Sequence, residues 1–262
     1  MKHKGKLIIF EGLDGAGKGT QLHLLQEYLE QENQKDETQI IMFQEYLNNI
    51  YNKNQQFELF SEYLISKKKA FATYDFPRYY DNFWGGMVGR MLSGEFKEDI
   101  DPYLRSMFYL LDQADACKKI RKDLHQGKIV ICNRYITSSY IFQTGMFKSA
   151  KDKAKYITWL EEAGYQQLGI IKPDVVLCLY VKPEIAQELI LKKNARDYLQ
   201  KSNKDINEKN LQIQINAGRE MLRFCKERKN WHLIDCMQED QLKSQEEIAR
   251  EIRSYLAEYI NL

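Results

Sequence analysis

The chain has 262 residues, a hydrophobic fraction of 44% and a formal net charge of +2. This length and composition suit one large α/β domain or two small ones with a hydrophobic core, and they argue against a disordered chain. The small net charge excludes a global field that would draw the protein onto nucleic acid or a membrane. No linker or internal repeat is visible, so we expect a single domain over residues 1–262.

The cysteines and the N-terminus indicate where the protein works. Five cysteines occur, an odd number and without CxxC spacing, which is typical of reduced and mostly buried thiols in the cytosol. The start, MKHKGKLIIFEG, has too short an apolar run for a signal peptide, and no later segment approaches ~18 apolar residues. We therefore expect a cytoplasmic protein without membrane or nucleic-acid partners.

Short apolar runs alternate with helical patterns along the chain. Buried strands are predicted at residues 6–11, 70–76, 128–132, 174–181 and 231–236. Helices are predicted from residue 17, over 104–125 and 154–167, and at the C-terminus over the apolar positions 248–259. This alternation predicts a five-stranded parallel sheet with helices on both faces. Two segments break it: a polar insertion with helical pieces at about 44–69, and a mobile charged loop at about 192–210.

A glycine-rich segment, GLDGAGKGT, follows the first strand and opens a helix, which is the context that a phosphate-binding loop requires. Its glycines let the backbone fold around an anion with N–H groups pointing inward, and the helix N-terminus adds partial positive charge. The Lys18 side chain can reach the β- and γ-phosphates of a nucleoside triphosphate. We expect ATP to be bound by Gly12, Gly15, Ala16, Gly17, Lys18, Gly19 and Thr20.

The strict loop pattern has a hydroxyl for Mg²⁺ where this chain has Gly19, and Thr20 is the nearest replacement. From Thr20 we expect only a weak contact to the metal or to a metal-bound water. The GKGT arrangement resembles adenylate kinases and related nucleoside monophosphate kinases, in which the metal is held largely through water. It is unlike the loops of GTPases and motor ATPases, which need a tight Mg²⁺ site for hydrolysis.

The segment FEGLDGAGKGTQ, with Asp14 inside the loop, resembles the thymidylate kinase family; adenylate kinases usually carry proline at that position. Five further segments resemble the family in the same order: Phe76-Pro77-Arg78, MVGRMLSGEF (87–96), NRYITSSYIFQ (133–143), KPDVVLCLYVKPE (172–184) and KDINE (204–208). The resemblance covers nearly the whole chain except 44–69. It implies a three-layer P-loop kinase fold with a lid at 192–210, transfer of phosphate from ATP to dTMP with Mg²⁺, and a homodimer.

The resemblance also implies roles for single residues. Lys18 would hold ATP, and Arg78 and Arg134 would hold the acceptor monophosphate, since guanidinium grips phosphate bidentately. Asp14 would meet the 3′-hydroxyl of the acceptor sugar.

Because the loop has Gly15 and Ala16 where some family members carry a basic residue, the lid would supply the last positive charge. Arg196 is the best candidate, supported by Lys192 and Lys193.

The remaining acceptor contacts are Tyr109, which would stack on the pyrimidine, Ser138, and Gln143 at the base edge. Plainer interpretations stay open. Arg78 could pair with a carboxylate, Tyr109 could belong to the core, and Arg196 could lie on a solvated charged face.

Two positions depart from the family pattern. Asn133 stands where the family has an aspartate that helps to organise Mg²⁺; an amide can bind a metal-bound water but lacks the charge, which Asp14 or Glu11 could supply instead. Gln113 stands where the family usually has an arginine that reads a carbonyl of the pyrimidine, and glutamine can still donate to it.

These departures keep two alternatives to a dTMP kinase open. Gln113 admits a kinase for another pyrimidine monophosphate or for a deoxynucleoside, although Arg78 favours an acceptor that already carries phosphate. Asn133 and the 44–69 insertion admit a weakly catalytic nucleotide-binding paralogue.

Overall fold

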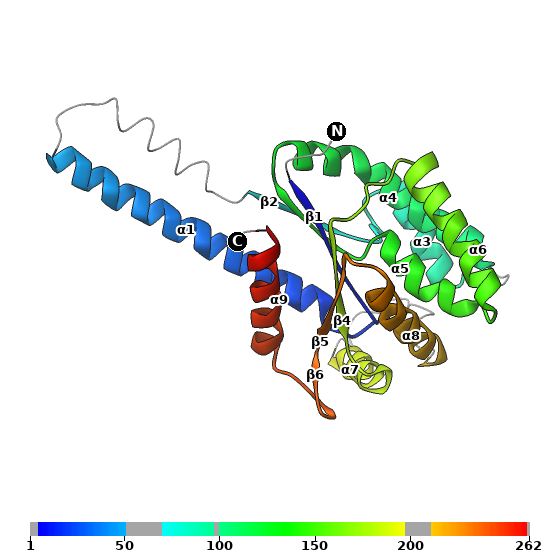
Figure 1. Cartoon of the computed structure of the whole chain (residues 1–262). Coiled ribbons are helices and arrows are strands. Elements are labelled where there is room, and N and C mark those ends of the chain that lie inside the picture. Colours follow the sequence, from blue (N-terminus) through cyan, green and yellow to red (C-terminus); the bar gives the residue numbers. More distant parts are fainter. Residues whose placement is uncertain (1–4, 51–69, 97–99, 197–210, 261–262) are drawn as a thin grey trace.

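A computed structural model describes residues 5–50, 70–96, 100–196 and 211–260 (Figure 1). The central sheet has five parallel strands in the order β2-β3-β1-β4-β5. Their bounds are β1 Lys6–Gly12, β2 Phe71–Asp75, β3 Ile129–Asn133, β4 Val175–Tyr180 and β5 Trp231–Asp235. All five predicted strands are therefore confirmed, and so is the parallel sheet.

Helices cover both faces of this sheet (Figure 1). Their bounds are α1 Lys18–Ile50, α3 Phe83–Leu92, α4 Pro102–His125, α5 Ile136–Phe142, α6 Ala150–Glu161, α7 Pro183–Arg196, α8 Leu211–Glu227 and α9 Gln245–Ile260. Helices α1 and α9 contact each other and one face, whereas α4, α5 and α8 contact strands from the other face. A π-helical turn, Glu162–Gln167, extends α6, and a 3₁₀ turn, Thr144–Met146, follows α5. A short hairpin, β6 Met237–Gln238 and β7 Gln241–Leu242, precedes α9.

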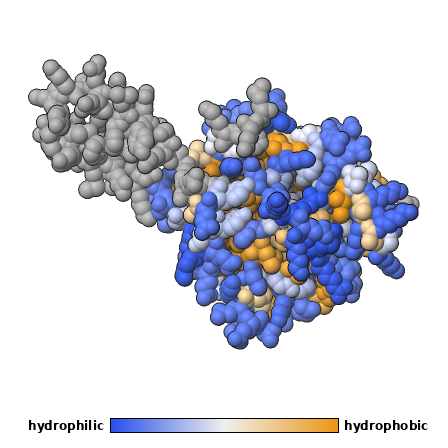
Figure 2. All heavy atoms as spheres, viewed as in Figure 1, coloured by the Kyte–Doolittle hydropathy of each residue, from blue (hydrophilic) through white to orange (hydrophobic). Residues whose placement is uncertain are grey.

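The core sits in the sheet interior because the central strands are apolar along nearly their whole length. Every residue of β1 after Lys6 is buried, as are the first four of β3 and the first five of β4. Strands buried on both faces need such continuous apolar runs. Hydrophilic residues cover most of the face seen in Figure 2. All five cysteines are free thiols and four are buried, as predicted.

The two segments that broke the sequence pattern are partly helical. Residues 44–50 continue α1, which projects well past the sheet (Figure 1), and 51–69 lie outside the described residues. Residues 192–196 complete α7, so the prediction of a loop from 192 is wrong for this stretch; Lys, Ala and Arg are good helix formers. The rest of that loop, 197–210 with its KDINE segment, lies outside the described residues. Within the described ranges, no helix is both long and apolar enough to cross a membrane.

Candidate functional site

The carboxyl end of β1 is the point where the strand order reverses, since the chain goes first to β2 and β3 on one side and later to β4 and β5 on the other. Ligands of open α/β sheets bind in the crevice at such a point. Here a cavity of about 1220 Å³ lies between the phosphate loop, the ends of β2 and β3, and helices α3, α4, α5 and α7. The site is built around this cavity.

The Lys18 side chain forms hydrogen bonds with the backbone of the phosphate loop. Lys18 Nζ donates to the carbonyl oxygens of Gly12 (3.1 Å) and Leu13 (2.7 Å), and only 6% of the residue is exposed. Burial, with the nearby positive charge of Arg134, lowers the pKa of Lys18 to about 7. Lys18 is therefore close to losing its proton near neutral pH, and an anionic phosphate bound beside it would stabilise the charged form of its amine.

Two glycines of the loop differ in what they require. Gly15 has φ +81°, and a Cβ there would lie 2.5 Å from the Ala186 carbonyl oxygen. A Cβ at Gly19 would meet nothing within 4 Å. Backbone geometry and space therefore require glycine at position 15. At position 19, in the first turn of α1, a side chain would project into open space.

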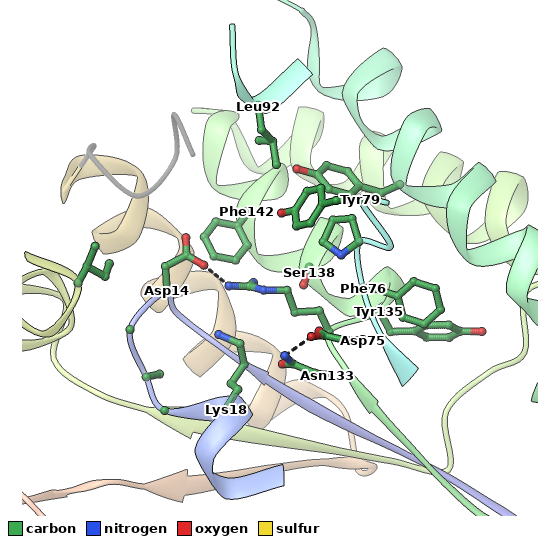
Figure 3. A pocket seen from close by; sticks show the side chains of 18 of the residues that line it. Asp14, Lys18, Asp75, Phe76, Tyr79, Leu92, Asn133, Tyr135, Ser138 and Phe142 are labelled. Atoms are coloured by element: carbon green, nitrogen blue, oxygen red, sulfur yellow. Dashed lines mark hydrogen bonds and ion pairs between the residues drawn. The ribbon is translucent and has the colours of Figure 1, made fainter. Parts of the chain in front are cut away.

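Arg134 connects the end of β3 with the phosphate loop. Its backbone adopts φ +63°, its N–H donates to the Phe10 carbonyl at 2.9 Å, and its guanidinium donates to Asp14 (Figure 3). Gln214 of α8, which is fully buried, donates to the other carboxylate oxygen of Asp14 at 2.8 Å and accepts from its backbone N–H at 3.2 Å. Burial would raise the pKa of Asp14, but the charges of Arg134 and Lys18 and the Gln214 hydrogen bond outweigh it and lower that pKa.

Glu11 lies beneath this ion pair. Its carboxylate is fully buried and accepts from the hydroxyls of Thr137 (2.7 Å) and Ser138 (2.9 Å) and from the Gly12 N–H (3.0 Å). Arg134 Nη1 lies 3.8 Å from it. Glu11 therefore supports Arg134 from below, and it is not among the residues that line the cavity.

Asp75 and Asn133 stand side by side at the ends of β2 and β3, where the strand register pairs them (Figure 3). Asn133 Nδ2 donates to Asp75 Oδ1 at 2.8 Å, and both residues line the cavity. Asn133 Oδ1 is buried and has no hydrogen-bond partner among the described residues. Partial burial raises the pKa of Asp75, although the Asn133 hydrogen bond and the charges of Arg134 and Lys18 act in the opposite direction.

Arg78 is held by carboxylates of α4. It donates through Nε to Asp112 (2.9 Å) and through Nη2 to Asp115 (2.7 Å), and its backbone N–H donates to Asp112 as well (3.0 Å). Asp112 is fully buried, and Arg78 is not among the cavity-lining residues. The pairing with carboxylates is thus what the structure shows, and a contact of Arg78 with phosphate stays a prediction.

The expected acceptor contacts lie together on the α4 and α5 side of the cavity: Tyr109, Gln113, Ser138 and Gln143. Gln113 is only 2% exposed, and its Oε1 has no hydrogen-bond partner within the described part of the chain. A buried amide oxygen without a partner is costly, so it marks a position at which a bound donor would be stabilising.

The cavity therefore brings together most of the predicted site. Of the loop residues, all but Gly12 line it, together with Asp14, Asn133 and Arg134. Arg196 ends α7, two of whose residues, Leu189 and Ile190, line the cavity; the side chains of Arg196 and Lys193 lie outside the described part. Lys192 is exposed and pairs with Glu188.

Sequence reasoning missed Asp75, Gln214 and Arg90, of which Asp75 and Arg90 line the cavity and Gln214 holds Asp14. Asp75 carried a signal, because it lies next to the last residue of the strand predicted at 70–76, at the edge of the sheet where ligands bind. Gln214 carried none, since 200 residues separate it from Asp14. Arg90 lay in a segment that was matched only as a helix, and its Nε bonds to Glu95 at 2.7 Å.

The donors in the cavity fit a magnesium ion that arrives with a nucleotide. Across the described residues, no group of three or more His, Cys, Asp or Glu could hold a metal by itself. Three carboxylates line the cavity: Asp14 and Glu95, which each pair with an arginine, and Asp75, which among the described residues pairs with none. The lining also includes the orphaned amide oxygen of Asn133 and the hydroxyl of Thr20. Mg²⁺ usually keeps several waters and takes one or two carboxylates plus substrate phosphates, which matches this set.

Comparisons with known proteins agree with this fold. A family model described as thymidylate kinase matches residues 52–252, a range that begins after the phosphate loop. The thymidylate kinase of Thermoanaerobacter sp. (strain X514) is 27% identical over 254 residues, covering 97% of this chain and all of that protein. The Plasmodium falciparum (isolate 3D7) thymidylate kinase is 28% identical over 189 residues, 71% of this chain and 66% of that protein. A solved structure of thymidylate kinase from Candida albicans matches with a TM-score of 0.65 at 16% identity, over 100% of this chain and 95% of that one; at this identity the likeness shows the fold.

Proposed function

We propose, because this chain belongs to the thymidylate kinase family, that it transfers the γ-phosphoryl group of ATP to dTMP, giving dTDP and ADP. One observation supports this most directly. A single cavity of about 1220 Å³ joins the phosphate loop to a separate group of aromatic and amide side chains on α4 and α5. Pockets for one small ligand usually measure roughly 300–1,000 Å³, so this space suits a donor and an acceptor together.

Phosphoryl transfer depends on positioning and on neutralising charge, and the chain has residues for both. Lys18 and the N–H groups of the loop would hold the β- and γ-phosphates. Asp75, Asn133 and Thr20 would hold the Mg²⁺ that arrives with ATP, and the ion would supply positive charge to offset the charge that develops on the transferred group. Arg134 would face that group from the end of β3, where it is already fixed by Phe10 and Glu11.

The Arg134–Asp14 ion pair explains how both predicted acceptor contacts can form at once. A phosphate that binds Arg134 competes with Asp14 for the same guanidinium. Once displaced, the Asp14 oxygen becomes free to accept from the 3′-hydroxyl of the sugar, while Gln214 still holds the other oxygen. The pair would therefore keep the site ordered before substrates bind.

We place Arg196 at the phosphates as the last positive charge, since α7 runs along the cavity and Arg196 is its final residue. Closure of the predicted lid over the site would also exclude water, which limits wasteful hydrolysis of ATP.

We further propose a cytosolic homodimer. Light scattering on the purified protein tests this, and a monomer at all concentrations would contradict it.

A coupled assay of ADP release tests the proposed activity. Pure protein with MgATP is supplied with dTMP, dUMP, UMP, dCMP, CMP, purine monophosphates and thymidine in parallel. We expect the highest kcat/KM with dTMP. Absence of dTMP-dependent ADP release, with turnover of another acceptor, would overturn the assignment.

A second candidate is a kinase with a wider choice of pyrimidine monophosphate, and the orphaned Oε1 of Gln113 favours it. A glutamine amide offers both a donor and an acceptor, so it can pair with either thymine or cytosine edges. Gln113→Leu, which keeps the size but removes both groups, should raise the KM for dTMP by about 10-fold or more while the KM for ATP stays unchanged. Similar kcat/KM values for dTMP and dCMP in the wild type would favour this candidate.

A further inference from the structure

We propose that Asp75 supplies the carboxylate that organises the magnesium ion of bound ATP, a role that the family gives to the aspartate replaced here by Asn133. The inference rests on the proposed function only in assuming that MgATP binds in this cavity. It follows from asking which acid beside Lys18 and Arg134 is available. Three carboxylates act electrostatically on Lys18: Asp14, Glu11 and Asp75.

The carboxylate oxygens of Glu11 and Asp14 already accept hydrogen bonds from other groups of the protein. Glu11 is fully buried, and its two oxygens accept from two hydroxyls and one N–H. Asp14 gives one oxygen to Gln214 and the other to Arg134 or, once an acceptor phosphate has taken the guanidinium, to the 3′-hydroxyl of the acceptor sugar. Neither can turn to a metal without leaving strong charge-assisted or buried hydrogen bonds unmade.

Asp75 is different. It is exposed and lines the cavity, and among the described residues the one hydrogen bond to its carboxylate, from Asn133 Nδ2, uses only Oδ1. Its other oxygen is available to a metal-bound water. Lys18 lies in the same corner of the cavity (Figure 3), so a ligand of Lys18 would come close to Asp75.

Asn133 then acts as a positioning residue. Its amide nitrogen orients the Asp75 carboxylate, and this leaves its own Oδ1 buried and without a partner in the described structure. Together the two side chains carry one negative charge, the same as a single aspartate. Compared with the family pattern, which has the carboxylate at the end of β3, this chain has it on the register partner at the end of β2.

This arrangement makes an aspartate at 133 harmful rather than helpful. Two carboxylates within hydrogen-bond distance repel each other, and one of them would take up a proton. Asn133→Asp alone should therefore weaken the site, whereas exchanging the two residues, Asp75→Asn with Asn133→Asp, should restore it.

Binding of a non-hydrolysable ATP analogue, AMP-PNP, tests this by calorimetry with and without Mg²⁺. In the wild type Mg²⁺ should strengthen AMP-PNP binding, and we call the ratio of the affinities with and without the metal the Mg²⁺ gain. In Asp75→Asn the Mg²⁺ gain should fall about 10-fold. Binding of metal-free AMP-PNP should be equal or tighter in this variant. The double exchange should recover most of the gain. Asp81→Asn is the matched control, since it removes the same charge from an exposed residue that does not line the cavity. Mn²⁺ binding in the presence of AMP-PNP, followed by electron paramagnetic resonance, should show the same pattern.

An unchanged Mg²⁺ gain in folded Asp75→Asn would overturn the inference, as would a rise in that gain in Asn133→Asp alone. The result is separable from the proposed function. Protein that releases no ADP with dTMP but needs Asp75 for the Mg²⁺ gain would refute the acceptor and keep this inference. Active protein whose Mg²⁺ gain ignores Asp75 would do the reverse.

Discussion

Arg134 donates a hydrogen bond to Asp14, joining the end of β3 to the phosphate loop across 120 positions of sequence. The arginine holds this position with a backbone φ of +63°, which is unfavourable for a residue with a Cβ. Strain of this kind, of order 1–3 kcal/mol, persists only where the surroundings fix the residue. Here the Phe10 carbonyl, Glu11 and Asp14 fix it together.

Arg134→Gln should lower kcat by about 10²–10³-fold, because it removes a pre-positioned charge from the transferred group. It should also change acid stability. Arg134 lowers the pKa of Asp14 below its usual 3.8, so this contact stabilises the fold above pH ~4 and is lost as pH falls through the folded-state pKa. Urea unfolding from pH 6 to pH 3 should therefore show a smaller loss of stability in the variant. Equal acid sensitivity in both proteins would count against the pairing.

Lys18 should take up a proton when phosphate binds. Burial and Arg134 lower its pKa to about 7, so at pH 8 most of the free protein carries it neutral; a bound phosphate favours the charged form. Calorimetry of AMP-PNP binding at pH 8, in buffers of different ionisation enthalpy, should show uptake of a large fraction of one proton. Lys18→Met should abolish it. Binding enthalpies that do not depend on the buffer would refute this prediction.

The same pKa shift sets the stability of the nucleotide-free protein. Between pH 7 and 10.5 the unfolded chain keeps the Lys18 proton and the folded chain does not, so stability should rise with pH over that window. Lys18→Met should remove this slope. A matched control is Lys155→Met, a substitution at an exposed lysine of α6, which should leave the slope unchanged.

Gly15→Ala should damage the loop, whereas Gly19→Ala should not. At Gly15 the new methyl would lie 2.5 Å from a backbone oxygen at φ +81°, so we expect a loss of at least ~1–3 kcal/mol and weaker AMP-PNP binding. At Gly19 the methyl enters open space within a helix, where alanine is favoured over glycine by ~0.5–1 kcal/mol. Thermal unfolding of both variants gives the comparison; similar shifts in Tm would show that loop geometry is not the deciding factor.

Arg78→Ala separates a structural role from a phosphate-binding one. The change leaves the buried carboxylate of Asp112 without its guanidinium, so we expect a loss of about 3 kcal/mol in stability. Arg78→Ala with Asp112→Ala should recover part of that loss, since no unpaired charge remains. If instead Arg78→Ala keeps its stability and only the KM for dTMP rises, Arg78 is a ligand of the acceptor.

The sheet was predictable from the sequence because the central strands β1, β3 and β4 are nearly continuous apolar runs, and because helical patterns lie between the strands. The phosphate loop was predictable for the same kind of reason, as a local pattern in a local context. The Asn133–Asp75 pair was not, because the two residues meet only through the register of β2 on β3. Gln214 reaches Asp14 from a helix near the other end of the chain, and no local signal marks such a contact.

Helix α1 begins at Lys18 and runs without a break to Ile50. Its 33 residues span about 50 Å at ~1.5 Å per residue. In a helix of this length, a small rotation at the phosphate loop produces a large displacement at the other end. A tilt of only about 5° at the loop would displace the far end by roughly 4 Å, for a rigid rod of that length. A spectroscopic label near Ile50 would therefore detect a tilt of that size on nucleotide binding, at a place far from any atom of the nucleotide, and an unchanged label signal would show that α1 stays fixed.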